Sequence, residues 1–231
     1  MNNLILDAEQ IRREQVTFIA KVYAWMCGAL ALTAVTALIT ASSPAILELI
    51  FGNKILFYGL IIAELGLVWY LSSAIQRMSA AAATGWFLFY SFLNGLTLSV
   101  IFVLYTTASI AGTFFVTAAT FGAMSLYGYY TKRDLTKWGS LLMMALIGLI
   151  LASVVNMFFN NPILYWITTY AGILIFVGLV AYDTQKIKDM NIIGNEGTEE
   201  DHKEAIMGSL ALYLDFINLF LYMLRLLGNR K

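Results

Sequence analysis

The chain has 231 residues, of which 60% are hydrophobic and only 12% are charged, and its formal net charge is zero. A mean hydropathy of +0.77 is far from that of a soluble domain. The neutral charge balance provides no field that would attract nucleic acid, and the length fits one compact membrane bundle.

The hydrophobic residues gather into seven runs, each long enough to cross a bilayer, which takes about 20 residues in a helix. Backbone polar groups inside lipid must be satisfied within the protein, and the runs lack the polar and apolar alternation of barrel strands, so we predict helices. The predicted spans are residues 18–41, 54–75, 85–106, 109–130, 138–158, 162–183 and 205–227.

The predicted spans divide the chain into three parts. These are a cytoplasmic N-terminal segment at 1–17, a single transmembrane domain of seven spans at 18–227 and, within that domain, a polar acidic loop at 191–204. The loop, NIIGNEGTEEDHKE, carries several carboxylates but lacks the ordered spacing of oxygen ligands that a calcium loop needs. We interpret it as a solvated segment.

Basic residues favour one side of the predicted bundle. Arg12 and Arg13 precede the first span, and every second connection after it is basic. Those connections carry Arg77, Lys132, Arg133, Lys137, Lys186, Lys188 and Lys203. The positive-inside rule therefore places the N-terminus in the cytoplasm.

The basic tail leaves two topologies open. Arg225, Arg230 and Lys231 would lie outside after a seventh full crossing, against the same rule. Either the last segment is re-entrant and returns the tail to the cytoplasm, or it crosses and the earlier connections outweigh its charge.

Two aspartates lie in the last two apolar runs. Asp183 closes the run AGILIFVGLVAYD, and Asp215 lies about ten residues into the seventh span, roughly 15 Å deep at 1.5 Å per residue. A carboxylate at the centre of a membrane helix costs about 2.5–3.5 kcal/mol on insertion scales and usually marks a proton or ion path or a polar contact between helices.

The two aspartates have two interpretations. Antiparallel neighbouring helices would bring Asp183 and Asp215 together, where one proton would be shared between them. Alternatively, each aspartate is a structural clamp that only caps or hydrogen-bonds a neighbouring helix.

Three further side chains are candidates for auxiliary roles. Glu64, in GLIIAELGLVWYL, either extends an ion path or faces a polar interior, where it pairs with Arg77 or a backbone group. Tyr182 and Tyr213 flank the aspartates, and they either donate hydrogen bonds to them or serve as interfacial anchors.

Signatures of catalysis are missing from the sequence. The one histidine, His202, lies in the polar loop, and no HExxH, GxSxG, P-loop or paired Cys/His motif occurs. An aspartyl intramembrane protease would also need two membrane aspartates, but the resemblance described next argues against it. We therefore expect no enzymatic activity, no cofactor and no firmly assigned metal site.

Three motifs carry a resemblance to a known family. They are FGAMSLYGYYTKRDL at 121–135, AYDTQKI at 181–187 and LYLDFINLFLYMLRL at 212–226. Together with the order of the spans, they resemble the Bax inhibitor-1 family, also called transmembrane Bax inhibitor motif proteins, over nearly the whole chain. The short N-terminus and overall length are similar to those of the bacterial members.

The resemblance implies a fold and a function. The family has six helices around a central hydrophobic seventh and is a pH-sensitive calcium leak. Its two-aspartate sensor matches Asp183 and Asp215, and an arginine of the second helix near the sensor matches Arg77. Calcium would be the permeant ion, transiently close to the aspartates, and not a cofactor.

The leading hypothesis is a calcium-permeable leak channel of the inner membrane, gated by a proton-sharing aspartate pair. One alternative is a non-conducting interaction protein that regulates a membrane protease or a stress response. Another is a proton-coupled transporter. The expected partners are the lipid bilayer, calcium ions and, for the interaction protein, the protease or another membrane protein.

Overall fold

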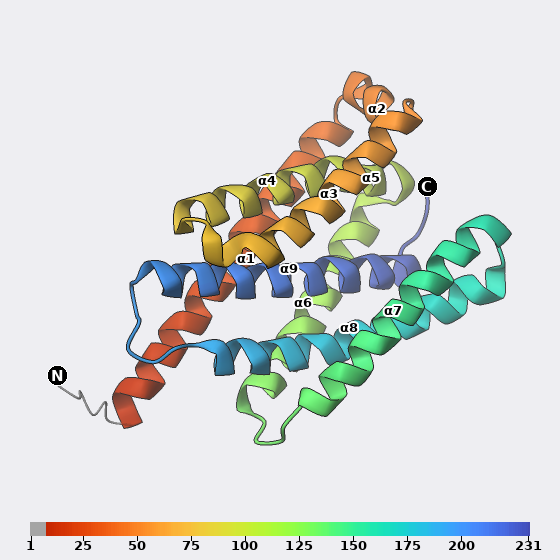
Figure 1. The fold of residues 1–231 in the computed structure, drawn as a ribbon. Coiled ribbons are helices and arrows are strands. Elements are labelled where there is room, and N and C mark those ends of the chain that lie inside the picture. The colour runs from red at the N-terminus through yellow and green to blue at the C-terminus, as the bar shows by residue number, and fades with distance from the viewer. Residues whose placement is uncertain (1–7) are drawn as a thin grey trace. The chain divides into compact units, whose positions relative to one another are not determined.

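The structure is a computed structural model that describes residues 8–231, and its regular elements in that range are helices (Figure 1). They are α1 (Ala8–Ala41), α2 (Pro44–Phe51), α3 (Lys54–Ala74), the 3-10 turn η1 (Ile75–Arg77), α4 (Ala80–Leu98), α5 (Val100–Leu104), α6 (Thr107–Tyr130), α7 (Thr136–Phe159), α8 (Pro162–Met190) and α9 (Glu199–Leu227). The predicted all-α class is confirmed.

Seven helical segments of the described chain are long and apolar enough to cross a membrane. They are Glu9–Ala41, Lys54–Arg77, Ala80–Leu104, Thr107–Tyr130, Thr136–Phe159, Pro162–Met190 and Glu199–Leu227. Each overlaps one predicted span, so the membrane bundle of seven helices is confirmed. The short helix α2 was not expected, and it begins at Pro44, whose fixed φ suits the first turn of a helix.

Three helix ends differ from the predicted ones. The helix α1 already includes residues 8–17 of the predicted N-terminal segment, whose first seven residues lie outside the described part. The helix α8 continues to Met190, and α9 begins at Glu199, so the predicted loop 191–204 is corrected to 191–198. The Thr198 hydroxyl accepts a hydrogen bond from the Asp201 backbone N–H at 3.2 Å, and acidic residues suit the first turn of a helix.

Polar caps allow the connections between spans to be short. The Asn53 side chain accepts backbone hydrogen bonds from Ile55 and Leu56 and so begins α3. Asn160 ends α7 in the left-handed region, with φ 47°, and the side chain of the next residue, Asn161, caps α8.

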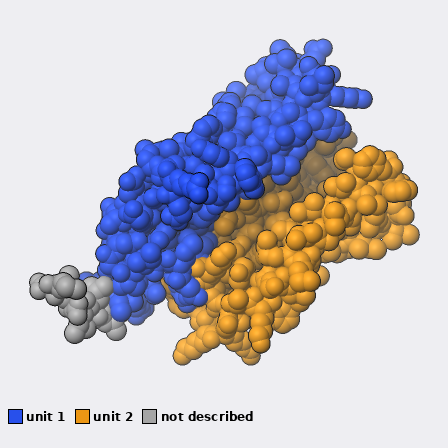
Figure 2. Space-filling view, in the orientation of Figure 1, with its two compact units in different colours: residues 1–100, 187–210 blue, residues 101–186, 211–231 orange. Residues whose placement is uncertain are grey.

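The chain forms two compact units (Figure 2). Unit 1 comprises the described residues up to Val100 together with Ile187–Leu210, and unit 2 comprises Ile101–Lys186 and Ala211–Lys231. The helix α9 contributes to both units, and 56% of its apolar window is buried, against 6% for the windows of α3 and α7. High burial of the last helix is the property expected of the central helix.

In unit 1, small residues let α1 and α4 pack closely. The Thr33 hydroxyl donates a hydrogen bond to the Ser91 carbonyl at 2.9 Å. A Cβ on Gly95 would lie 2.6 Å from the Cβ of Thr36, so only glycine fits at this crossing. Close backbone approach through small residues is the usual way in which membrane helices associate.

In unit 2, α7, α8 and α9 share an apolar core, and α6 packs against α8. The buried members of this core are Leu149, Ile175, Phe176, Leu179 and Leu219. Gly128 of α6 lies against the backbone of Ala181 in α8. This contact fixes α8 two residues before Asp183.

The last helix, α9, continues from Glu199 to Leu227 without a break, which is long enough for a full crossing, and the side on which the tail lies stays a prediction. The Thr106 N–H donates to the Asn229 carbonyl at 3.2 Å, and the Lys231 N–H donates to the Leu104 carbonyl at 3.0 Å. The tail therefore lies beside the start of α6, whose 24 residues extend about 36 Å at 1.5 Å per residue toward the connection 131–135. The tail and that basic connection lie at opposite ends of unit 2.

Candidate functional site

The side chains of Asp183 and Asp215 are joined by a hydrogen bond within unit 2. Asp183 is half-buried on α8, and Asp215 is only 4% exposed on α9. The structure thus brings together the two acids that were singled out from the sequence.

The antiparallel packing of α8 and α9 explains why these two positions meet. The rings of Phe176 and Tyr222 stack at 5.9 Å, and Leu179 and Leu219 belong to the same buried core. From Phe176 to Leu179 and from Leu179 to Asp183, α8 advances by three and then four residues. From Tyr222 to Leu219 and from Leu219 to Asp215, α9 goes back by the same numbers. Residues three and four apart share a helix face, so the two aspartates continue the apolar contact by one more turn.

A hydrogen bond between two carboxyl groups needs a proton, because an ionised carboxylate only accepts. The pair is therefore suited to hold one proton between the two acids. Loss of that proton would leave two negatively charged carboxylates in contact. The Asp215 Oδ2 atom is buried and accepts no hydrogen bond from an N–H or hydroxyl donor of the described residues. A buried acceptor of this kind can take a further proton, a water molecule or a cation.

One cation lies near the pair. Lys186, almost one turn after Asp183 on α8, is exposed and interacts electrostatically with Asp183. Its ammonium group also lies 6.0 Å from the centre of the Tyr182 ring. The lysine can therefore favour a negative charge on Asp183 more than on the deeper Asp215.

The two neighbouring tyrosines have different environments. Tyr182 is half-buried and packs against Gly139 of α7, and within the described chain it donates no hydrogen bond to either aspartate. Tyr213 is completely buried, so it is not an anchor at the membrane surface. For Tyr182 the structure thus favours the alternative without a hydrogen bond to the pair, and its auxiliary role stays a prediction.

Two residues of the AYDTQKI motif were missed as positioning groups. The Thr184 hydroxyl donates to the Ser125 hydroxyl of α6 at 3.1 Å. Gln185 accepts from the Leu135 N–H at 2.8 Å and donates to the Arg133 carbonyl at 2.9 Å. These bonds tie α8 to α6 and to the connection 131–135. Polar residues directly after a membrane aspartate were the signal in the sequence.

Glu64 belongs to a separate polar group in unit 1. Its carboxylate accepts a hydrogen bond from the Thr97 hydroxyl at 2.9 Å, which links α3 to α4. Nearby, the Asn94 amide donates to the Tyr90 hydroxyl at 3.3 Å, and the buried Asn94 Oδ1 has no partner in the described chain. Of the alternatives for Glu64, the polar-interior interpretation fits these contacts, and Glu64 forms no ion pair with Arg77 among the described residues.

Arg77 ends η1 in unit 1 and is exposed. Within residues 8–231 it forms no ion pair. The aspartate pair belongs to unit 2, so the role of Arg77 beside the sensor stays a prediction.

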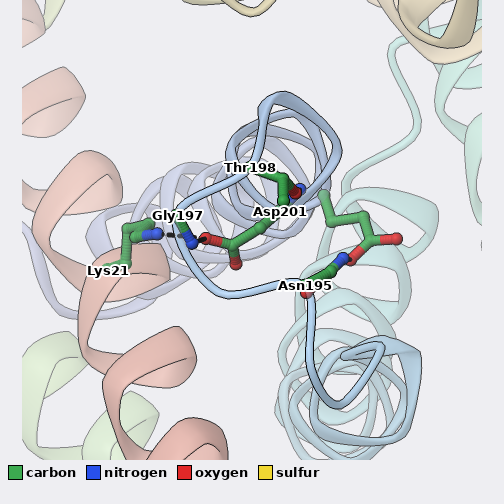
Figure 3. A network of polar contacts seen from close by, with 6 residues as sticks. Lys21, Asn195, Gly197, Thr198 and Asp201 are labelled. Atoms are coloured by element: carbon green, nitrogen blue, oxygen red, sulfur yellow. Dashed lines mark hydrogen bonds and ion pairs between the residues drawn. The ribbon is translucent and has the colours of Figure 1, made fainter. Parts of the chain in front are cut away.

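A polar network fixes the start of α9 in unit 1 (Figure 3). Asp201, only 2% exposed, pairs with Lys21 of α1 and accepts a hydrogen bond from the Gly197 N–H at 2.9 Å. Gly197 has φ +80°, a conformation that favours glycine. The Asn195 amide donates to Glu204 at 3.3 Å. The interpretation of 191–204 as a solvated segment is therefore wrong around Asp201.

His202 connects the start of α9 to α1 and α4. Its Nε2 lies 2.9 Å from the Thr84 hydroxyl, and its ring packs edge-on against Trp25 at 5.6 Å. The Glu199 carboxylate accepts a hydrogen bond from the Ala80 N–H at 2.8 Å. No group of three or more His, Cys, Asp or Glu residues in the described part has the arrangement of a metal site.

The helical architecture, the seven apolar spans and the buried acids define a multi-pass membrane protein of the all-α class. The family model described as "Inhibitor of apoptosis-promoting Bax1" matches residues 15–231. The chain belongs to this family, the Bax inhibitor-1 family, and the resemblance found in its motifs is confirmed.

Similar proteins occur in distant bacteria. The chain is 55% identical over 216 residues to the inner membrane protein YbhL of Escherichia coli K12, and the matched region covers 93% of this chain and 92% of YbhL. It is 48% identical over 230 residues to a protein of Borreliella burgdorferi, covering 98% and 99%. A Rickettsia prowazekii protein, RP147, is 48% identical over 219 residues, covering 93% and 90%.

Proposed function

We propose that the protein is a pH-sensitive, calcium-permeable leak channel of the inner membrane, gated by the Asp183–Asp215 pair. The observation that carries this proposal is the side-chain hydrogen bond between two acids on two membrane-spanning helices. The family match over residues 15–231 supports it, because the resemblance to this family implies a two-aspartate sensor at these two positions. No enzymatic step and no resident cofactor are involved.

Gating follows from the chemistry of the pair. With one proton present, the hydrogen bond between Asp183 and Asp215 holds α8 against α9. When the proton leaves, two carboxylates in contact repel each other, and the repulsion is strong where water is scarce. Separation of the helices then opens the path, and carboxylate oxygens are suitable transient ligands for calcium.

The proposed topology has the N-terminus in the cytoplasm and the C-terminal tail outside. Basic residues near the ends of the helices support it, since those of the cytoplasmic connections outnumber those of the outer ones. The name of YbhL, an inner membrane protein, supports the choice of membrane.

A flux assay tests the proposal. The purified protein is reconstituted into liposomes loaded with a calcium-sensitive dye. Calcium flux is then measured at several pH values between about pH 6 and about pH 8, the range around physiological pH. Flux above that of empty liposomes is expected. A flux equal to that of empty liposomes at every pH would overturn the channel.

A matched pair of variants separates the sensor from a general charge effect. Asp183→Asn removes a member of the pair, whereas Asp189→Asn removes an exposed carboxylate from the same helix. Only the first should alter the pH dependence of calcium flux. Equal effects of both variants would contradict gating by the pair.

The two alternative hypotheses make different predictions in related assays. A proton-coupled transporter gives uptake that saturates with substrate, whereas a leak rises with the calcium gradient. An interaction protein gives no flux and copurifies with a membrane protein after crosslinking in native membranes.

A further inference from the structure

Two arginines and three tyrosines gather at the C-terminal end of unit 2. This arginine–tyrosine cluster consists of Arg225, Arg230, Tyr105, Tyr165 and Tyr222. The Arg225 Cζ lies 5.0 Å from the centre of the Tyr165 ring and 5.1 Å from that of Tyr222. The Arg230 Cζ lies 5.8 Å from the Tyr105 ring, and its Nη2 donates to the Tyr165 hydroxyl at 3.3 Å. Tyr165 thus contacts both guanidinium groups.

The tail holds Arg230 in this position through backbone contacts. The neighbouring Asn229 N–H donates to the Ser109 hydroxyl at 2.9 Å, and its carbonyl accepts from the Thr106 N–H. A Cβ on Gly228 would meet the Tyr105 ring at 2.6 Å, so glycine lets the tail lie flat on this ring. The backbone on both sides of Arg230 is therefore fixed, and its exposed side chain lies against the Tyr105 ring.

The cluster carries positive charge without a carboxylate partner. Neither Arg225 nor Arg230 forms an ion pair within the described residues, unlike Lys21 and Arg13. Arg225 also donates no hydrogen bond to any described residue, although a guanidinium has five N–H donors. Aromatic rings stabilise the faces of a guanidinium and leave its edge free for an anion.

The position of the cluster fits the headgroup region of a bilayer. Arg225 lies in the last turn of the membrane-spanning helix α9, and Tyr165 is in the first turn of α8. Directly beside Tyr165, Trp166 and Tyr170 stack with ring centres 6.0 Å apart and are 44% and 53% exposed. Exposed tryptophan and tyrosine at helix ends mark the level of the headgroups.

We propose that the arginine–tyrosine cluster binds the phosphate of an anionic phospholipid, such as phosphatidylglycerol. Two guanidinium edges match the oxygen geometry of a phosphate group, and charge-assisted hydrogen bonds to it are strong. An anionic headgroup is favoured over a zwitterionic one, because the cluster has no negative side chain to bind a headgroup ammonium. The site is independent of the proposed ion path.

The experiment is a titration of the detergent-purified protein with phosphatidylglycerol or phosphatidylcholine, read by native mass spectrometry. Tighter binding of phosphatidylglycerol is expected, and Arg225→Gln combined with Arg230→Gln should weaken it by at least about tenfold. Arg12→Gln combined with Arg13→Gln removes two exposed arginines of α1 and should leave the binding unchanged. Equal binding of both lipids, or equal loss in both double variants, would overturn the proposal.

Two further arms keep the test decisive. Inorganic phosphate added in excess should not displace the lipid, and displacement would show an anion site without lipid recognition, which contradicts the proposal. If the double glutamine variant does not fold, Arg225→Lys keeps the charge but loses the planar, two-pronged donor edge. Weaker binding of phosphatidylglycerol is expected for it, and unchanged binding would refute a role for the guanidinium.

Discussion

The backbone carbonyl of Ala181 lies where a Cβ on Gly128 would stand, so α6 and α8 touch backbone to backbone. The contact lies two residues before Asp183 and one turn before Gln185. It fixes the position of α8 along its axis and its rotation about that axis, close to the point where Asp183 meets Asp215 of α9. A glycine on a neighbouring helix is therefore part of the support of the candidate sensor.

Gly128→Ala is expected to destabilise the protein by about 1–3 kcal/mol, because the added methyl group forces α6 and α8 apart. Gly122→Ala, in the same helix, is the control, since its Cβ would meet no atom within 4 Å. This change should be neutral or stabilise by up to about 1 kcal/mol through helix propensity. Thermal unfolding of the detergent-solubilised protein measures both. Similar melting temperatures for the two variants would argue against the close contact.

Calcium flux should rise as the pH rises through the titration of the aspartate pair. Deprotonation removes the hydrogen bond between Asp183 and Asp215 and adds a negative charge that attracts calcium, so both effects act in the same direction. Asp215→Asn cannot lose this proton and should give a flat profile between about pH 6 and about pH 8. Liposome flux at fixed calcium gradient measures it. An unchanged profile in the variant would remove Asp215 from the sensor.

Lys21→Met should destabilise unit 1 by about 1–3 kcal/mol, since it leaves the buried Asp201 carboxylate without its cation. Arg13→Met breaks an exposed pair with Glu9, whose side chain is 72% exposed, and should change the stability by less than about 0.5 kcal/mol. Thermal unfolding followed by tryptophan fluorescence compares the two variants. Equal effects would mean that burial of Asp201 does not matter.

The sequence predicted the helical class and the seven spans, and it offered the meeting of Asp183 with Asp215 as one of two interpretations. These features depend on the length of apolar runs and on the cost of a charged residue in lipid, and both can be read directly from the sequence. Helix ends were less predictable. The helix α9 begins at Glu199 because a threonine cap and the ion pair of the buried Asp201 with Lys21 of α1 outweigh the polar character of the segment.

The contacts of neutral polar residues were the part that the sequence did not reveal. The partner of Glu64 is the hydroxyl of Thr97, and the partners of Gln185 are backbone groups of a connection fifty residues away. Such pairings depend on how two packed helices are rotated about their own axes. In a helix that is apolar on all sides, the pattern of apolar residues does not define this rotation.

Gln185→Leu tests whether the connection 131–135 is anchored through the motif that contains Asp183. The glutamine side chain accepts from the Leu135 N–H and donates to the Arg133 carbonyl, so leucine leaves both backbone groups unpaired and should cost about 1–3 kcal/mol. Gln76→Leu, at an exposed position, is the matched control and should change the stability by less than about 0.5 kcal/mol. Hydrogen exchange of the Leu135 amide, together with thermal unfolding, measures the effect. Faster exchange at Leu135 in the first variant alone is expected, and unchanged exchange would show that the amide is protected by another part of the fold.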